Sequence, residues 1–171
     1  MYKQYIAYAQ SPLGLVEITA DEQYITSLRL LKSADKTLPA DNPDELLPHI
    51  RQCIVELGEY FAGTRTDFTI PIKQNGTDFQ QKVWQQLLKI PYGTTISYIE
   101  LARRLGNSKL TRAVGGANHR NKLWIVVPCH RVIGADGSLT GYGGGLECKQ
   151  WLLQHEAGNG AGIQKQIAYE R

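Results

Sequence analysis

The residue types best suited to chemistry stand together at Cys129, His130 and Arg131, directly after an apolar, strand-like run that stops at Pro128. A cysteine reacts as its thiolate, which a neighbouring base or positive charge makes available near neutral pH. His130 and Arg131 offer both kinds of group within two residues. The segment therefore contains a candidate nucleophile together with candidate activating groups.

The adjacency of Cys129 and His130 does not make a site by itself. Neighbouring residues of an extended strand point to opposite faces, so the simpler interpretation is a buried structural cysteine beside a surface histidine. A tight turn directly after Pro128 is needed to bring both side chains to one place.

Ordered motifs on both sides of this segment favour the chemical interpretation. They are Thr77-Asp78-Phe79-Gln80-Gln81-Lys82-Val83-Trp84, Ile90-Pro91-Tyr92-Gly93, Ser97-Tyr98, Arg112-Ala113-Val114-Gly115-Gly116-Ala117, Pro128-Cys129-His130-Arg131-Val132-Ile133, Gly141-Tyr142-Gly143-Gly144-Gly145 and Trp151-Leu152-Leu153-Gln154-His155-Glu156. From residue 77 to 156 the chain closely resembles the O6-alkylguanine–DNA alkyltransferase family, which repairs alkylated guanine. The resemblance over residues 1–76 is looser.

The resemblance implies that Cys129 is the alkyl acceptor. Attack of its thiolate on the alkyl carbon expels guanine and leaves a thioether that water does not cleave, so such a protein should act once. In the family a hydrogen-bond chain runs from the cysteine through water and the adjacent histidine to a glutamate, and the matching residues are His130 and Glu156. This is the nucleophile, base and orienting-acid logic of a catalytic triad. Taken alone, Glu156 would be interpreted as a surface carboxylate at a helix end.

The resemblance also implies which residues handle the target base, which has to be swung out of the stacked duplex. Arg112 matches the side chain that enters the vacated space, and Ala113 follows it on the same recognition helix. Tyr98 matches the tyrosine that hydrogen-bonds the extruded base and crowds the phosphate on its 3′ side. Without the resemblance, Arg112 would be an exposed helix arginine and Tyr98 a half-buried helix tyrosine.

Three further positions complete the implied site. Asn121 matches the asparagine that ties together the turns around the active site, and Tyr142 matches an aromatic wall of the pocket. Gly143 stands where some relatives have serine, with its backbone N–H expected to face the guanine O6. The carbonyls of Cys129 and Val132 are expected to meet the guanine amino group.

The implied partner is double-stranded DNA carrying O6-alkylguanine, approached from the minor groove by a monomer, with O4-alkylthymine as an open question. No cofactor is expected. No metal is expected either, because residues 1–52 contain no cysteine to match the amino-terminal zinc ligands of some relatives. Three widely spaced cysteines and the absence of a long apolar run predict a cytoplasmic protein, with the nucleoid if bacterial, and no membrane partner.

Hydrophobic patterning predicts an α+β chain of two parts and a tail, namely residues 1–72, 77–158 and 159–171. The tail is glycine-rich and polar and is expected to be flexible. The first part is expected to be a small mixed sheet with one helix, ribonuclease H-like by resemblance. Its expected strands are 2–9, 13–20, 25–31 and 66–70, with a turn at Ser11-Pro12-Leu13-Gly14 and a polar loop over 32–42. A helical pattern after Pro43 places Cys53 on its apolar stripe and stops at Gly63.

The second part is expected to be mostly helical and to resemble a winged helix-turn-helix. Thr77 and Gln80 form a capping-box signature, and the expected helices cover 77–90, 95–105, 108–118 and 147–156. Gly106 and Asn107 join the middle pair. Gly115 and Gly116 lie inside the third helix at a cost of about 1 kcal/mol each against alanine, which predicts a close approach of another backbone.

Charge divides the chain in the same way. The formal net charge of +3 consists of −4 over residues 1–71 and +7 over residues 72–171, so only the second part is expected to meet a polyanion. Two alternatives remain open: a helix-turn-helix DNA-binding protein without chemistry, and a thiol hydrolase that uses Cys, His and Glu and turns over.

Overall fold

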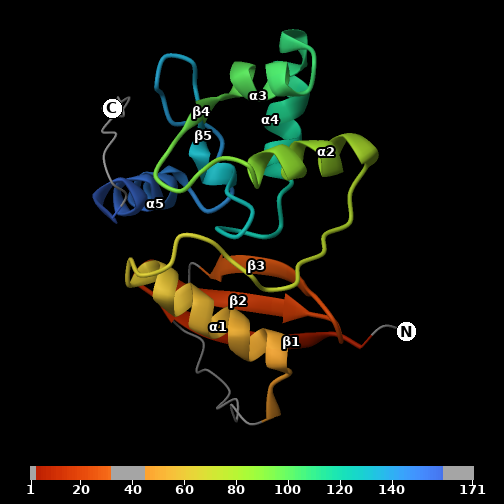
Figure 1. Cartoon of the computed structure of the whole chain (residues 1–171), viewed down its shortest axis with the longest axis vertical. Helices are drawn as coiled ribbons and strands as arrows, with labels where there is room; N and C mark the ends of the chain where they lie inside the picture. Colours follow the sequence, from red (N-terminus) through yellow and green to blue (C-terminus); the bar gives the residue numbers. More distant parts are fainter. Residues whose placement is uncertain (1–2, 32–44, 160–171) are drawn as a thin grey trace. The chain divides into compact units, whose positions relative to one another are not determined.

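The computed structural model describes residues 3–31 and 45–159. The chain forms two compact units, Met1–Gln74 with Lys122–Trp124, and Asn75–Asn121 with Ile125–Arg171 (Figure 1). The polar loop predicted over 32–42, and all of the predicted tail after residue 159, lie outside the described residues.

The first unit contains a three-stranded antiparallel sheet whose strands follow in chain order: β1 (Tyr5–Ser11), β2 (Gly14–Ala20) and β3 (Ile25–Leu31). The predicted hairpin is confirmed, with Pro12 and Leu13 as its two-residue connection. Gly14 has φ 121°, which only glycine adopts easily, and the Ser11 hydroxyl donates to the Gly14 carbonyl at 2.7 Å. A two-residue loop fixes the register of the whole sheet.

Helix α1 (Pro48–Phe61) runs along one face of this sheet in Figure 1. It begins at Pro48 rather than near Pro43, because proline suits the first helical turn, where a missing N–H costs no hydrogen bond. Cys53 is fully buried, as predicted, and Tyr60 rather than Phe61 completes the buried stripe. Gly63 follows the helix with φ 77° and is the predicted stop.

The strand predicted over 66–70 is wrong. Within the described residues only Ile72 makes a bridge there, parallel to Ile25 of β3. The Glu56 carboxylate of α1 instead accepts hydrogen bonds from the backbone N–H of Thr69, at 2.8 Å, and from its hydroxyl. A side chain thus satisfies the backbone group that a strand ladder would have used. The mixed character predicted for the sheet is limited to isolated parallel bridges, the second of which joins Leu28 to Leu123.

The second unit starts with helix α2 (Asp78–Leu87), which carries the predicted capping box. The Thr77 hydroxyl accepts from the Gln80 N–H at 3.2 Å, and the Gln80 side chain accepts from the Thr77 N–H at 3.0 Å. On its buried side, Trp84 donates through Nε1 to the Ala117 carbonyl at 2.9 Å. This bond connects α2 to helix α4 (Thr111–His119).

The helix predicted over 95–105 begins later than expected. Ile96 and Ser97 form a short strand, β4, and helix α3 (Tyr98–Arg104) begins at Tyr98 because the Ser97 hydroxyl caps it, accepting from the Glu100 N–H at 3.1 Å. Strand β4 pairs in parallel with β5 (Val132–Ile133). This pairing brings Tyr98 close to the segment that carries Cys129.

The helix predicted over 108–118 is divided into two. Ser108–Leu110 forms a 3₁₀ turn, η2, capped by the Asn107 side chain, and α4 (Thr111–His119) follows. Gly106 turns the chain between α3 and η2 with φ 93°. The predicted pair of short helices joined by a turn is therefore present, and the chain is α+β.

Helix α5 (Leu146–Asn159) ends the described chain and is longer than the predicted 147–156. Its most buried side chains repeat at helical spacing: Lys149, Leu152, Leu153 and Glu156. No helix in the two described segments is long and apolar enough to cross a bilayer.

Candidate active site

A tight turn centred on Pro128 presents Cys129. Pro128 has φ −82° and ψ 63°, and the Cys129 N–H donates to the Val127 carbonyl at 2.8 Å, which is the geometry of an inverse γ-turn. The 3₁₀ turn η3 (Cys129–Arg131) follows at once, closed by the Arg131 N–H donating to the Pro128 carbonyl at 3.1 Å. The sequence required such a turn for Cys129 and His130 to serve one site, and it is present.

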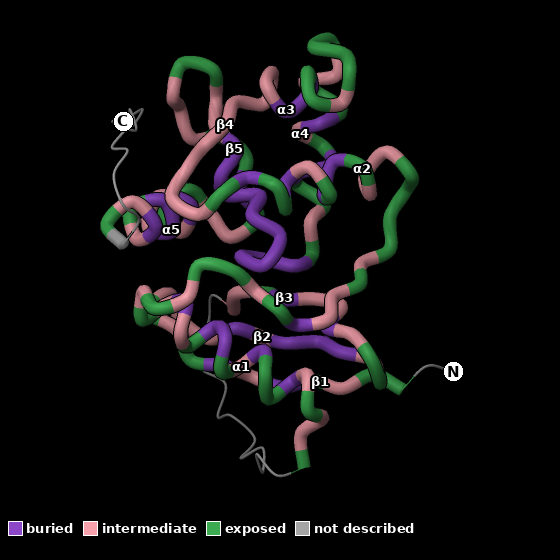
Figure 2. The backbone as a smooth tube through the Cα atoms, in the orientation of Figure 1, coloured by how far each residue is buried: buried purple, intermediate pink, exposed green. Residues whose placement is uncertain are grey.

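The chain that leads to this turn is buried and strained. Residues 123 to 132 are all buried (Figure 2), and Cys129 itself is only 6% exposed. Ile125 has φ 69°, a left-handed conformation that is rare for a β-branched residue and costs of the order of 1–3 kcal/mol. Asn121 donates through Nδ2 to the Val127 carbonyl at 2.8 Å. This bond bridges the strained residue, because Ile125 lies between Asn121 and Val127 in the chain.

Behind Cys129, three charged or titratable side chains form a buried cluster. His130 is 0% and Glu156 1% exposed, and His130 Nε2 lies 2.7 Å from Glu156 Oε1. Arg131 holds the same carboxylate with two bonds, Nε to Oε2 at 2.9 Å and Nη2 to Oε1 at 3.0 Å. The Gly93 N–H adds a bond to Oε2 at 3.2 Å, and Arg131 Nη1 donates to the Ile90 carbonyl at 2.7 Å. Glu156 is therefore a buried carboxylate that bonds three different residues, and not a surface carboxylate.

Burial and the contacts within the cluster set the charge states of Glu156 and His130. Burial opposes ionisation of Glu156, but the charges and hydrogen bonds of His130 and Arg131 outweigh it and hold its pKa well below the ordinary value. Burial lowers the pKa of His130 despite the opposing attraction of Glu156, so the ring is neutral at pH 7. A carboxylate only accepts, so Nε2 carries the hydrogen. The buried Nδ1, which has no hydrogen-bond partner among the described residues, is then the basic nitrogen.

Lys149 is a site residue that the sequence patterns did not reveal. It is 0% exposed, and its Nζ donates to the Val132 carbonyl at 2.6 Å and to the Thr140 carbonyl at 3.1 Å. Nζ also lies 3.5 Å from the Tyr98 hydroxyl, which itself donates to the Thr140 carbonyl at 3.2 Å. Burial lowers the pKa of Lys149 to about 8, opposed by its attraction to Cys129. The sequence did offer one signal of this burial: Lys149 and Glu156 are seven residues apart, so they lie on the same helix face as the apolar Leu152 and Leu153.

The Cys129 thiol responds to opposing effects. Burial raises its pKa, while a hydrogen bond from the Asn121 side chain and the charge of Lys149 act in the opposite direction. The net direction is upward. The resting side chain is therefore a protonated thiol and not a permanent thiolate, because the burial of Cys129 outweighs the stabilising effect of its neighbours.

Asn118 is a second residue that sequence reasoning missed. It is 2% exposed on α4, and its Nδ2 lies 3.3 Å from the Cys129 carbonyl. Tyr98 lies near it, since a hydrogen bond from the Asn118 side chain partly offsets the rise that burial causes in the pKa of Tyr98. An asparagine next to alanine in a glycine-containing helix gives no sequence signal of a site.

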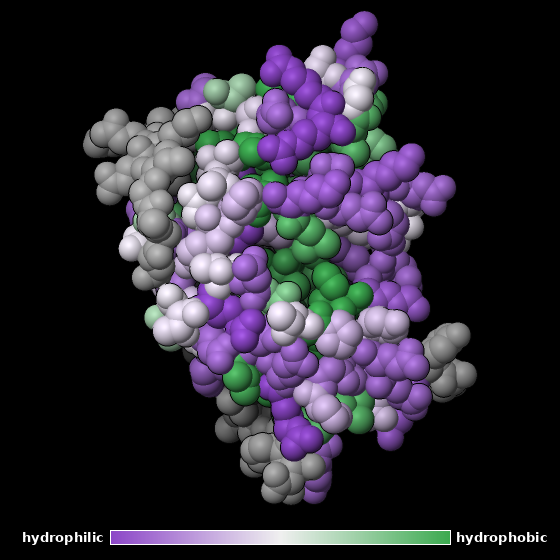
Figure 3. Space-filling model, viewed as in Figure 1, coloured by the Kyte–Doolittle hydropathy of each residue, from purple (hydrophilic) through white to green (hydrophobic). Residues whose placement is uncertain are grey.

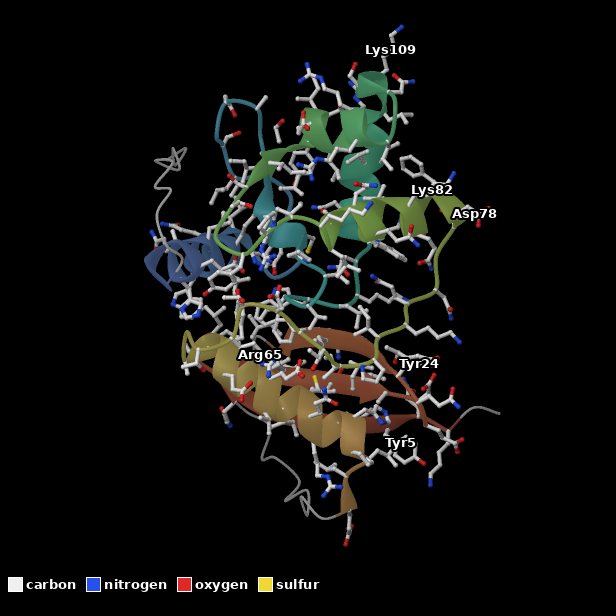
Figure 4. The ribbon with its side chains drawn as sticks, viewed as in Figure 1. Tyr5, Tyr24, Arg65, Asp78, Lys82 and Lys109 are labelled. Atoms are coloured by element: carbon white, nitrogen blue, oxygen red, sulfur yellow. The ribbon has the colours of Figure 1, made fainter. Side chains whose placement is uncertain are left out.

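The other face of α4 is open to solvent. Arg112, Ala113 and Gly116 are exposed there. The close backbone approach predicted for the two glycines does not occur among the described residues: a Cβ at Gly116 would meet nothing within 4 Å, and one at Gly115 would only touch the Tyr98 ring at 4.0 Å. Lys109, in the turn that precedes α4, is also exposed, and Figure 4 shows its side chain projecting from η2.

The predicted residues thus fall into two groups. The first group lies around η3 and consists of Cys129, His130, Glu156, Val132, Tyr98 and Asn121. In it, His130 contacts Glu156, and Lys149 contacts both Val132 and Tyr98. Asn121 contacts the carbonyl of Val127, two residues before Cys129. Tyr142 is buried, whereas Arg112, Ala113 and Gly143 lie on exposed backbone, with open space around Gly143. No group of three potential metal ligands occurs among residues 3–31 and 45–159.

The chain matches two family models. Residues 3–74 match the ribonuclease-like domain of 6-O-methylguanine DNA methyltransferase, and residues 78–158 match its DNA binding domain. Together the two matches cover most of the sequence.

Individual relatives are similar over nearly their whole length. A methylated-DNA–protein-cysteine methyltransferase of Methanosarcina acetivorans is 43% identical over 152 residues, which is 89% of this chain and 97% of the relative. The constitutive methylated-DNA–protein-cysteine methyltransferase of Bacillus subtilis is 45% identical over 157 residues, covering 89% and 94%. The solved structure of Mycobacterium tuberculosis OGT in complex with DNA is similar with a TM-score of 0.77 at 42% identity, covering 89% of this chain and 92% of that chain.

Proposed function

Because the chain belongs to the 6-O-methylguanine DNA methyltransferase family, we propose that it repairs DNA by moving the alkyl group of O6-alkylguanine onto its own Cys129. Methyl transfer from methylated DNA to a protein cysteine is the activity that its relatives' names state. The observation that supports Cys129 as the acceptor is the turn at Pro128. It presents a thiol beside a neutral histidine whose other nitrogen is fixed by a buried carboxylate.

The transfer is one in-line displacement. His130 Nδ1 takes the thiol proton through a bridging water, which suits a buried basic nitrogen without a protein partner. The sulfur then forms a bond to the alkyl carbon as the bond from that carbon to O6 breaks. The electron pair goes to the leaving guanine, and the proton released from the thiol is replaced, by exchange through water, by one on N1, which gives the normal base. The thioether has no group that water can cleave, so each molecule acts once.

The proton has to leave during the reaction, because the pKa of Cys129 is raised in the free protein. Glu156 keeps the hydrogen of His130 on Nε2 and stabilises the imidazolium that forms, as the acid of a catalytic triad does. Arg131 holds Glu156 ionised and in place. The charge of Lys149 stabilises the developing thiolate.

The DNA is double-stranded and is approached from the minor groove by α4 of a monomer. The target nucleotide leaves the stack, Arg112 enters the space, and Ala113 packs beside it. Tyr98 and Tyr142 line the pocket, the Gly143 N–H faces O6, and the Cys129 and Val132 carbonyls face the amino group. The protein works in the cytoplasm, where the thiol remains reduced.

A comparison of the unmodified protein with Cys129→Ala tests this function. Both are mixed with a duplex that contains one O6-methylguanine, and methyl loss from DNA and duplex affinity are measured. We expect the unmodified protein to remove the methyl group, and Cys129→Ala to bind DNA without removing it. Binding by both proteins without demethylation would indicate a helix-turn-helix protein without chemistry. Repeated ester or amide hydrolysis by the unmodified protein would indicate a thiol hydrolase.

A further inference from the structure

Asn118 lies at the centre of the site with a fixed orientation. A backbone carbonyl can only accept a hydrogen bond, so the side-chain atom 3.3 Å from the Cys129 carbonyl has to be the amide nitrogen. The amide oxygen therefore points away from that carbonyl. The opposite orientation of the amide would place two acceptors together.

The Asn118 Oδ1 atom is buried and accepts no hydrogen bond from the described part of the chain. An unpaired buried acceptor is costly, and its retention calls for an explanation. Tyr98 is a neighbour of Asn118: a hydrogen bond from the Asn118 side chain partly offsets the rise that burial causes in the pKa of Tyr98, and a Cβ at Gly115, one turn earlier on α4, would lie 4.0 Å from the Tyr98 ring. Asn118 thus stands between Tyr98 and Cys129, the two residues that the proposed function assigns to the extruded base.

The substrate offers only one group that could pair with this oxygen. Alkylation at O6 removes the hydrogen from N1 of guanine, so the exocyclic 2-amino group is the only hydrogen-bond donor left on the base. The Cys129 and Val132 carbonyls, which also face that group in the proposed function, already accept from Asn118 and Lys149. Asn118 Oδ1 differs from these carbonyls because, among the described residues, it accepts no hydrogen bond at all.

We propose that Asn118 Oδ1 accepts a hydrogen bond from the 2-amino group of the extruded O6-alkylguanine and so determines which alkylated bases the site accepts. This rests on the proposed function and adds a specificity residue to it. A base without a donor at this position leaves Oδ1 unpaired in the complex. The site therefore discriminates against O6-alkylhypoxanthine, which lacks the amino group, and against O4-alkylthymine, which has no ring donor.

The test compares two duplexes of one sequence that contain either O6-methylguanine or O6-methylhypoxanthine. Single-turnover rate constants are measured for the unmodified protein and for Asn118→Leu, which has a similar volume and no polar atom. We expect the unmodified protein to prefer O6-methylguanine by about tenfold or more. In Asn118→Leu the preference should become several-fold smaller, because only the O6-methylguanine rate loses the hydrogen bond to Oδ1.

Two more variants separate recognition from general damage to the site. Asn118→Asp keeps the shape and the acceptor oxygens, so it should retain a preference for O6-methylguanine even where both rates fall. Val114→Ala perturbs the buried face of the same helix without touching a polar group and should leave the preference unchanged. An unchanged preference in Asn118→Leu, with both rates reduced equally, would overturn the inference alone. Failure of the unmodified protein to react with either duplex would overturn the proposed function as well.

Discussion

The hydrogen on the His130 ring determines what that residue can do. With Nε2 bonded to the Glu156 carboxylate at 2.7 Å, the hydrogen is on Nε2 and the lone pair is on Nδ1. The basic nitrogen of His130 is therefore Nδ1 only because Glu156, 26 positions further along the chain, accepts a hydrogen bond from Nε2. Single substitutions that keep the shape of this pair can change the chemistry without changing the fold.

Glu156→Gln is the sharpest such substitution. The new amide can donate to Nε2, which moves the hydrogen of His130 to Nδ1 and removes the base, so we expect transfer from free O6-benzylguanine to slow by about a hundredfold or more. Thermal unfolding should be measured in parallel, because Arg131 loses its buried partner. Glu147→Gln, on the exposed side of the same helix, is the matched control and should react normally. Equal rates for Glu156→Gln and the control would return Glu156 to a structural role.

Lys149→Met tests the charge next to the thiol. The substitution removes a positive charge that opposes the burial effect, so the pKa of Cys129 should rise further, and modification of Cys129 by iodoacetamide should slow. Burial lowers the pKa of Lys149 to about 8, so the unmodified protein loses this charge at alkaline pH. The difference between the two proteins should be largest below pH 8 and fade above it. Lys82→Met, at the exposed lysine labelled on α2 in Figure 4, is the control. A difference that grows above pH 8 would contradict the assignment.

At the scale of elements, helix α4 serves two purposes with two faces. Val114, Ala117 and Asn118 are buried toward the site, while Arg112 and Gly116 face solvent. A helix with one exposed and one buried face can contact DNA with the first and pack against the site with the second. Variants on the exposed face should therefore affect DNA-dependent steps and spare the reaction of a free base.

Arg112→Ala separates base extrusion from phosphate binding. If the side chain fills the stack, its loss makes the extruded state less populated at a cost of a few kcal/mol, so transfer from duplex DNA should fall much more than DNA affinity. Free O6-benzylguanine needs no extrusion and should react almost as fast as with the unmodified protein. If Arg112 only met a phosphate, affinity for all DNA would fall and the salt slope would decrease by about one. Equal losses on duplex and free base would mean that Arg112 supports the pocket.

Gly116→Ala asks whether DNA approaches the exposed face closely. Nothing in the described chain lies within 4 Å of an added Cβ, so the variant should gain about 1 kcal/mol in unfolding free energy from helix propensity. Its duplex affinity should nevertheless fall, because the methyl group meets the DNA backbone. Chemical denaturation and a binding titration measure the two effects. A stabilised protein with unchanged affinity would remove the reason for glycine at this position.

Element boundaries show where sequence patterns succeed and where they fail. The capping box at Thr77 and the two-residue hairpin were predictable because each is a local hydrogen-bond pattern. The strand expected over 66–70 was not formed, because the side chain of Glu56, from the preceding helix α1, accepts the Thr69 N–H. Burial of Lys149 is equally non-local: its partners are carbonyls of other segments, and periodicity alone treats a lysine as exposed.

At the scale of the whole molecule, the charge pattern agrees with a division of labour along the chain. Residues 1–71 carry −4 and residues 72–171 carry +7, and the site residues lie in the second unit. The surface in Figure 3 is largely hydrophilic where it covers α2 and α3. Residue types alone made Cys129 a candidate nucleophile, and the resemblance made Glu156 a candidate partner of His130. The position of Asn118 and the raised pKa of the thiol emerged only from the three-dimensional packing.

The most direct test of the central claim is the stoichiometry and location of the transferred group. The protein is mixed with an excess of a duplex that carries an isotope-labelled O6-methylguanine, and the reaction is followed by intact mass and peptide mapping. The account predicts that product stops increasing at one methyl group per active molecule, with the label on Cys129. Continued turnover, or a label on Cys53 or Cys148, would contradict it.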